Sequence, residues 1–202
     1  MTKIYLASGS PRRREILELM KLDFTVMSAD ADEELPNGTS PESAGEILAS
    51  RKARALKDEL CKKGLFDADT VIIAADTLVW CDGERLGKPS GKEDAKSMLL
   101  TLSGKAHFVC TGTCIIKGER SMSTSEISTV YMRAFTEAEA DAYVATGEPL
   151  DKAGAYGIQG IGSVLVDRID GDFFSVMGLS PKTVCKLMRA VGLPYFDTIS
   201  KI

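Results

Sequence analysis

The chain has 202 residues, and its hydrophobic fraction of 44% and charged fraction of 27% are ordinary for a globular protein with a substantial core. Its net charge of −4 gives no electrostatic footprint for a nucleic-acid partner. No apolar run approaches the roughly 20 residues of a membrane helix, and no signal-peptide region precedes the first strand, so we expect a cytoplasmic protein without membrane contact.

The first predicted elements meet at a basic turn. A short apolar strand over residues 4–7 leads to Ser10 and Pro11, which are typical of an N-cap and a first helical residue. The arginines at 12–14 then occupy the first helical turn, where unpaired N–H groups already carry partial positive charge. The positive arginine side chains are therefore repelled by this end of the helix. A bound anion would offset the repulsion, so the turn predicts a phosphate site. A solvated basic turn is the alternative.

The following segments predict a buried strand flanked by helices. Residues 24–27 indicate a second strand, and Ser40 with Pro41 opens a helix that runs to about Lys63. The apolar run over 69–75 is typical of a central strand buried on both faces, and we expect it to end at Asp76 and Thr77.

The second half of the chain mixes hairpins with helices. A hairpin is predicted over 78–86, and two further β-rich segments, 108–117 and 123–133, are joined by a polar turn. Capping-box matches at 90–93 and 136–139 open helices that end near residues 102 and 147.

A glycine-rich stretch over 147–162 is predicted to be an ordered loop whose backbone approaches other groups closely. A strand over 164–166, a turn at 170–172, one more strand, and a helix from Ser180 complete the chain. Because helices and strands alternate while several strands are linked by hairpins, we predict an α/β fold with a mixed twisted sheet and flanking helices, in a single domain over residues 1–202.

The inventory of reactive residues is narrow. His107 is the only histidine, which excludes multi-histidine metal sites and argues against a Ser-His-Asp triad. The five cysteines contain no CxxC pair and are expected to be thiols in a reducing compartment. Carboxylates, lysines and arginines must therefore carry any catalysis.

Several polar residues are candidates for that role. Asp76 follows an apolar strand, where it either caps a turn or stands at the sheet edge that carries sites in α/β proteins. Together with Glu33, it could hold a hard divalent ion with help from substrate phosphates. Lys88 and Lys52 would be solvated surface groups unless a substrate lies beside them. Gln159 has donor and acceptor atoms suited to a base edge, although a packed loop without a ligand would also account for its surroundings.

Taken together, these residues resemble the Maf family of nucleoside triphosphate pyrophosphatases, also known as septum-formation inhibitor proteins. The resemblance runs in order along nearly the whole chain. The segments that carry it are Ser8 to Arg13, Glu33, Lys52-Ala53, Ala75 to Thr77, Gly87 to Pro89, Leu102 to Gly104 with His107, Asp151 to Gly160, and Gly171-Asp172.

The resemblance implies a fold similar to that of the inosine triphosphate pyrophosphatases, with two closely packed lobes around a cleft. It implies hydrolysis of a nucleoside triphosphate to the monophosphate and pyrophosphate, with a divalent metal such as Mg²⁺ or Mn²⁺ at Glu33 and Asp76. Asp76 corresponds to the family's proton acceptor, acting on water directly or through the metal. A homodimer is a further family-level expectation that no residue demands.

Substrate residues also follow from the resemblance. Ser8, Arg13, Lys52 and Lys88 are expected to bind the substrate. Arg12, Thr77 and Gln159 look like the set of the dTTP/UTP-preferring branch. Hydrolysis of 7-methyl-GTP is the alternative within the enzyme class, and a non-catalytic nucleotide sensor that inhibits division is the alternative outside it.

Overall fold

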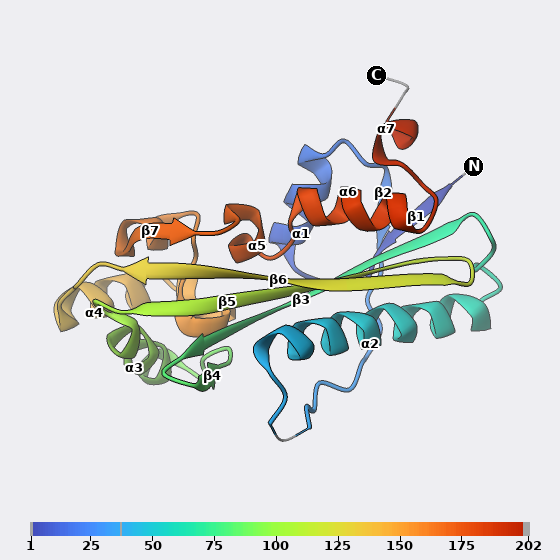
Figure 1. Cartoon of the computed structure of the whole chain (residues 1–202). Coiled ribbons are helices and arrows are strands. Elements are labelled where there is room, and N and C mark those ends of the chain that lie inside the picture. The colour runs from blue at the N-terminus through green and yellow to red at the C-terminus, as the bar shows by residue number, and fades with distance from the viewer. Residues whose placement is uncertain (1, 37, 200–202) are drawn as a thin grey trace. The chain divides into compact units, whose positions relative to one another are not determined.

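The fold begins with three parallel strands. In the computed structural model, which describes residues 2–36 and 38–199, β1 (Lys3–Leu6) lies between β2 (Phe24–Val26) and β3 (Thr70–Cys81) (Figure 1). Leu6 is in register with Val26 on one side and with Ile73 on the other. The connections run through α1 (Pro11–Leu19) and α2 (Pro41–Lys62). They step across the sheet in opposite directions, so right-handed crossovers place these helices on opposite faces.

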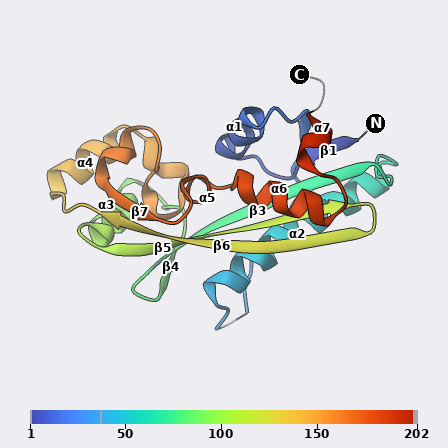
Figure 2. The same cartoon turned by 45° about the horizontal axis from the view of Figure 1, so that its top comes forward.

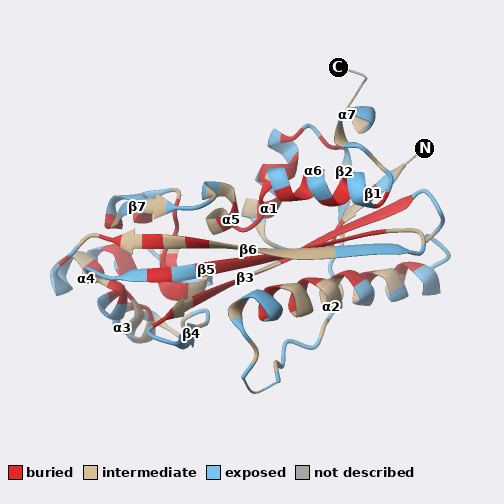
Figure 3. Ribbon diagram, viewed as in Figure 1, coloured by how far each residue is buried: buried red, intermediate tan, exposed pale blue. Residues whose placement is uncertain are grey.

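Apolar packing of α2 against the strands builds the first core. Four small or branched side chains along the helix, Ala49, Ala53, Leu56 and Leu60, are fully buried. They pack against Ile72 and Ala74 of β3 and against Cys114 and Ile116 of the neighbouring strand β5. The red segments of β3 and β5 in Figure 3 are their buried residues, whereas α2 alternates between buried and exposed residues along its length.

A close backbone approach fixes α2 on β5. A Cβ atom at Gly112 would lie 1.9 Å from the carbonyl oxygen of Gly45, a helix residue, so no side chain fits there. The helix begins where the sequence predicts: Ser40 is its N-cap and accepts a hydrogen bond of 3.3 Å from the Ser43 N–H.

The remaining strands are mostly antiparallel, and they complete the mixed sheet that the sequence predicts. They are β4 (Glu84–Leu86), β5 (Ala106–Lys117), β6 (Arg120–Met132) and β7 (Val166–Asp170). The described residues form a seven-stranded sheet in the order β2-β1-β3-β5-β6-β7, with β4 paired to β3. Figure 2 shows the strands from a second direction.

The chain divides into two compact units. The first contains the residues up to Asp76, Thr111–Glu126, and those from Gly178 onward, and it includes α6 (Pro181–Ala190) and α7 (Tyr195–Thr198). The second contains Thr77–Cys110 and Ile127–Met177. Among the described residues, no helix is long and apolar enough to span a membrane.

The second unit has its own core. Helices α3 (Lys92–Leu102) and α4 (Glu137–Ala145) pack on each other and on strand residues such as Val109 and Val130. Three short 3-10 turns follow α4: η1 (Glu148–Asp151), η2 (Ala153–Ala155) and η3 (Ile161–Leu165). Helix α5 (Phe173–Met177) ends the unit.

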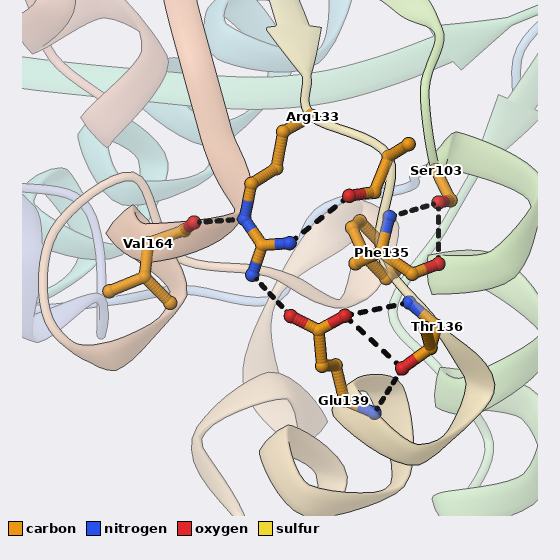
Figure 4. A network of polar contacts seen from close by, with 7 residues as sticks. Ser103, Arg133, Phe135, Thr136, Glu139 and Val164 are labelled. Atoms are coloured by element: carbon orange, nitrogen blue, oxygen red, sulfur yellow. Dashed lines mark hydrogen bonds and ion pairs between the residues drawn. The ribbon is translucent and has the colours of Figure 1, made fainter.

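The start of α4 confirms one sequence prediction in detail. Thr136 Oγ1 accepts from the Glu139 N–H, and the Glu139 carboxylate accepts from the Thr136 N–H, which is the reciprocal capping box (Figure 4). Glu139 also accepts from Arg133, whose guanidinium reaches the carbonyl of Val164.

Other local predictions were wrong. Strand β3 does not end at Asp76 but continues to Cys81, because its last residues pair with β4. Ser90 is not an N-cap; Gly91 takes that position, and Asp94 accepts from the Ser90 N–H and hydroxyl instead. Residues 164–165 belong to a 3-10 turn, with the strand starting at Val166, and the segment after the turn at 170–172 is helix α5.

Candidate active site

The carboxyl end of β1 lies beside the middle of β3. Residues Lys3 to Leu6 of β1 pair in parallel with Thr70 to Ile73, and β3 continues past this pairing. The chain therefore leaves β1 at a carboxyl edge of the parallel strands, which is where open α/β sheets bind their ligands. The Ala7 N–H donates to the Ile73 carbonyl over 2.8 Å, so the pairing extends to the residue before Ser8. Asp76 lies three positions beyond Ile73 along β3.

Ser8 and Arg13 form a buried pair at this edge. The Ser8 hydroxyl oxygen accepts from an Arg13 terminal nitrogen at 2.9 Å and from the Ser10 N–H at 3.2 Å. Arg13 Nε donates to the Gly178 carbonyl at 2.9 Å, so the guanidinium is held from two sides. Ser10 occupies the N-cap position but its side chain makes no cap hydrogen bond, and the first turn of α1 contains no acidic residue.

The electrostatic surroundings of Arg13 contain both candidate carboxylates. Burial lowers the pKa of Arg13, and the nearby Arg12 lowers it further, whereas Asp76 and Glu33 raise it. Arginine nevertheless remains protonated in proteins. The site therefore holds a buried, fixed positive charge beside two negative ones.

Lys52 joins the two carboxylates. Its ammonium group contacts Glu33 at 2.8 Å and also contacts Asp76. The Asp76 side chain is only 13% exposed and that of Lys52 20%, whereas Glu33 is largely exposed. Lys52 on α2 thus binds two carboxylates that lie 43 residues apart in sequence.

Arg51, the residue before Lys52, was not singled out from the sequence. Its guanidinium contacts the Asp32 carboxylate at 3.1 Å and donates to the carbonyls of Asp32 and Glu34, on either side of Glu33. It therefore fixes the loop that presents Glu33. No sequence signal marks this contact, because a single arginine on a helix face is usually solvated.

The chemistry of this donor set suits a hard divalent ion. Two carboxylates already share one cation, and Mg²⁺ is commonly bound by one or two carboxylates together with substrate phosphates. Among the described residues there is no group of three or more histidine, cysteine, aspartate or glutamate side chains arranged for a metal. Glu33 and Asp76 thus offer two carboxylates, the number with which Mg²⁺ is bound when phosphates supply further ligands.

The second unit contains the other predicted residues. Thr77 follows Asp76 in β3, and its side chain takes the opposite face of the strand because neighbouring strand residues alternate. Lys88 is exposed in the loop after β4, and this loop is tied to the glycine-rich stretch because the Gly154 N–H donates to the Gly87 carbonyl at 3.0 Å.

Gln159 lies in the tightly folded stretch between η2 and η3. Its Oε1 atom is buried and has no hydrogen-bond partner among the described residues. A buried amide oxygen without a partner is uncommon and costs free energy. The predicted close backbone approaches are present here: a Cβ atom at Gly154 would lie 3.0 Å from Val79, and one at Gly157 2.8 Å from the Gln159 carbonyl.

A solved structure resembles the chain weakly. The Staphylococcus aureus Ham1 protein matches with a TM-score of 0.49 and 14% sequence identity, over 98% of this chain and 94% of that one. The fold described above is defined by the strand order of the chain itself.

Sequence relatives are much closer. A dTTP/UTP pyrophosphatase of Bacillus cereus strain B4264 is 45% identical over 98% of this chain and 97% of its own length. Proteins of the same name from Bacillus mycoides strain KBAB4 and Bacillus anthracis are 43% and 45% identical over 98% and 89% of this chain, and over 97% and 90% of their own lengths. The model of the family described as Maf-like protein matches residues 3–191. With a family model spanning nearly its whole length and relatives well above 30% identity, the chain belongs to the Maf-like protein family.

Proposed function

We propose that this protein hydrolyses dTTP and UTP to the monophosphate and pyrophosphate. The observation that carries the proposal is the charge cluster beside the end of β1, in which Arg13 and Lys52 lie near Asp76 and Glu33. The name dTTP/UTP pyrophosphatase, borne by relatives that match almost end to end, supports the same substrates.

The phosphates provide the main electrostatic problem of the reaction. A triphosphate carries roughly four negative charges at neutral pH, and these repel an attacking water. Arg13 is buried and fixed, so it stabilises charge without first having to be ordered. Both acceptor positions of the Ser8 hydroxyl are taken, so this residue would offer its proton to a phosphate oxygen. Lys52 would move its hydrogen bonds from the carboxylates to the phosphates, and Lys88 would add a further cation.

Asp76 is the residue that would act on water. The water oxygen attacks the α-phosphorus, the bond to the bridging oxygen of pyrophosphate breaks, and the proton of the water passes to the Asp76 carboxylate. Asp76 is well placed for this role because it is largely buried and its orientation is set by Lys52. When bound, a divalent ion such as Mg²⁺ or Mn²⁺ at Glu33 and Asp76 would neutralise charge on the leaving pyrophosphate.

Base selection is assigned to Arg12, Thr77 and Gln159. Gln159 supports this role because its amide oxygen has no partner among the described residues. A glutamine amide can donate and accept at once, which suits the edge of uracil or thymine, where an N–H group lies beside a carbonyl oxygen. A homodimer and a cytoplasmic location remain predictions.

A substrate panel tests the proposal. Pyrophosphate release from dTTP, UTP, CTP and 7-methyl-GTP with Mg²⁺ should be fastest for the first two. Faster hydrolysis of 7-methyl-GTP would show that this nucleotide is preferred to dTTP and UTP. Nucleotide binding without any pyrophosphate release would favour a non-catalytic sensor. Asp76→Asn should abolish turnover while circular dichroism remains that of the wild type. Near-normal turnover in that variant would exclude Asp76 as the catalytic carboxylate.

A further inference from the structure

Two side chains outside the predicted site hold both ends of the segment that carries Gln159. The Glu148 carboxylate accepts from the backbone N–H groups of Ile161 and Gly162, each at 3.0 Å. It also accepts from the Tyr143 hydroxyl at 2.9 Å. The Tyr143 oxygen in turn accepts from the Gly157 N–H at 3.0 Å. Residues 157 and 161–162, which flank Gln159, are therefore fixed to one hydrogen-bonded pair.

The backbone of this segment lies directly on these side chains. A Cβ atom at Gly162 would lie 2.4 Å from the Tyr143 oxygen, and one at Gly160 would lie 2.8 Å from a Glu148 oxygen. Gly160 also has a φ angle of +80°, which disfavours other residues. The glycines at these positions are therefore needed for the contact with Tyr143 and Glu148.

The hydrogen bonds have a single consistent direction. Burial opposes the charge of Glu148, but the bonds from Gly162, Ile161 and Tyr143 outweigh it, and the pKa of Glu148 is lowered. Burial raises the pKa of Tyr143, so this hydroxyl keeps its proton. That proton goes to Glu148, and the Tyr143 oxygen remains to accept from Gly157.

We propose that Tyr143 and Glu148 are positioning residues for base recognition, because they hold the segment 157–162 so that the Gln159 amide is presented in one orientation. Neither residue needs to touch the nucleotide. The inference rests on the proposed function, in which Gln159 reads the base. It adds that the selectivity of Gln159 depends on a carboxylate and a phenol that are not among the residues expected to bind the phosphates.

The pair UTP and CTP gives the most direct readout. The two nucleotides differ only at the base edge, where cytosine presents an amino group and an unprotonated nitrogen in place of a carbonyl and an N–H. A glutamine amide held in one orientation matches one of these patterns, whereas a mobile amide can match both. We therefore measure kcat/KM for both nucleotides and take their ratio as the selectivity.

Tyr143→Phe removes both the proton given to Glu148 and the acceptor for Gly157. Glu148→Gln keeps an acceptor oxygen but loses the charge, and it places an amino group against a backbone N–H. We expect the UTP/CTP ratio to fall about tenfold in Tyr143→Phe, the equivalent of one lost hydrogen bond. The kcat for UTP at saturation should stay within about threefold of the wild type, because the phosphate-binding residues are unchanged.

Glu139→Gln is the matched control in the same unit. Like Glu148, Glu139 accepts several hydrogen bonds, here in the capping box of α4, and the substitution weakens them. It should lower the melting temperature without changing the UTP/CTP ratio. Gln159→Ala should lower the ratio at least as much as Tyr143→Phe.

The outcomes distinguish a failure of the proposed function from a failure of the positioning role of Tyr143 and Glu148. If the wild type releases no pyrophosphate from UTP, or if Gln159→Ala leaves the ratio unchanged, the proposed function or its assignment of Gln159 fails. If Gln159→Ala lowers the ratio while folded Tyr143→Phe and Glu148→Gln keep the wild-type value, the positioning role is refuted. A fall in melting temperature without a change in ratio refutes it as well. If either Tyr143→Phe or Glu148→Gln does not fold, the UTP/CTP ratio of the other variant tests the positioning role.

Discussion

The buried His107 makes a quantitative prediction about stability and pH. Its side chain is 1% exposed, and its Nε2 atom lies 2.8 Å from the Tyr156 hydroxyl. Its Nδ1 atom has no hydrogen-bond partner among the described residues. Burial lowers the pKa of His107 from 6.5 to about 4, because the charged imidazolium would lose its hydration there.

The sign of the effect follows from proton binding. At pH values between about 4 and 6.5, the unfolded chain binds a proton on this histidine that the folded protein does not. The free energy of unfolding is therefore largest above pH 6.5 and falls as the pH decreases toward 4. At 1.36 kcal/mol for each pKa unit, the complete effect is about 3 kcal/mol, of which about 2 kcal/mol is lost between pH 7.5 and pH 5.

Urea unfolding at several pH values between 7.5 and 5 measures this slope directly. Because the chain contains no second histidine, any histidine contribution to this slope comes from His107. His107→Gln should lower stability at all pH values and flatten the slope, since glutamine does not titrate. Tyr156→Phe is the matched control: it removes the hydrogen-bond partner but leaves the histidine buried, so the slope should persist.

The histidine proton resonances provide a second measurement. In the folded protein they should not titrate above about pH 5, in line with the lowered pKa. A midpoint near 6.5, or a His107→Gln variant whose stability still falls by about 2 kcal/mol between pH 7.5 and 5, would show that burial of His107 does not cause the pH dependence.

Three further changes test other parts of the structure. Lys52→Gln removes the cation shared by two carboxylates, so Mn²⁺ should bind more tightly than to the wild type when no nucleotide is present; unchanged affinity by calorimetry would count against a metal at these carboxylates. Gly112→Ala places a methyl group 1.9 Å from the Gly45 carbonyl and should destabilise the protein by several kcal/mol or prevent folding; a small shift in urea midpoint would contradict the close packing of α2 on β5. Ser180→Ala removes the N-cap of α6 and should cost about 1 kcal/mol in the same assay, with an unchanged midpoint as the contrary result.

Local signals account for what could be predicted from the sequence. Ser40 with Pro41 and Thr136 with Glu139 identify helix starts, since each cap forms within four residues. The hairpin turn at Asp82 is confirmed for the same reason. The basic turn over residues 8–14 is also local, and the structure places Arg13 against Ser8 within it, while phosphate binding there stays a prediction.

Long-range contacts account for what was missed. Asp76 looks like the end of a strand because polar residues usually interrupt apolar runs, yet β3 continues because β4 returns to pair with its last residues. Arg51 and Glu148 gain their roles from backbone groups 13 to 19 residues away, and a single sequence contains no sign of these partners. Ser10 occupies the N-cap position, but its side chain makes no cap hydrogen bond, and its N–H donates to the Ser8 hydroxyl.

The order in which the chain visits its two compact units restricts how such a protein can change over evolution. The chain passes between the units after residues 76, 110, 126 and 177, and the first three passages fall inside β3, β5 and β6. A recombination event that exchanged one unit would have to rejoin the chain at four places, three of them within hydrogen-bonded strands. Neither unit can therefore be inherited as a module. New substrate preferences are expected to arise by substitutions within one undivided chain.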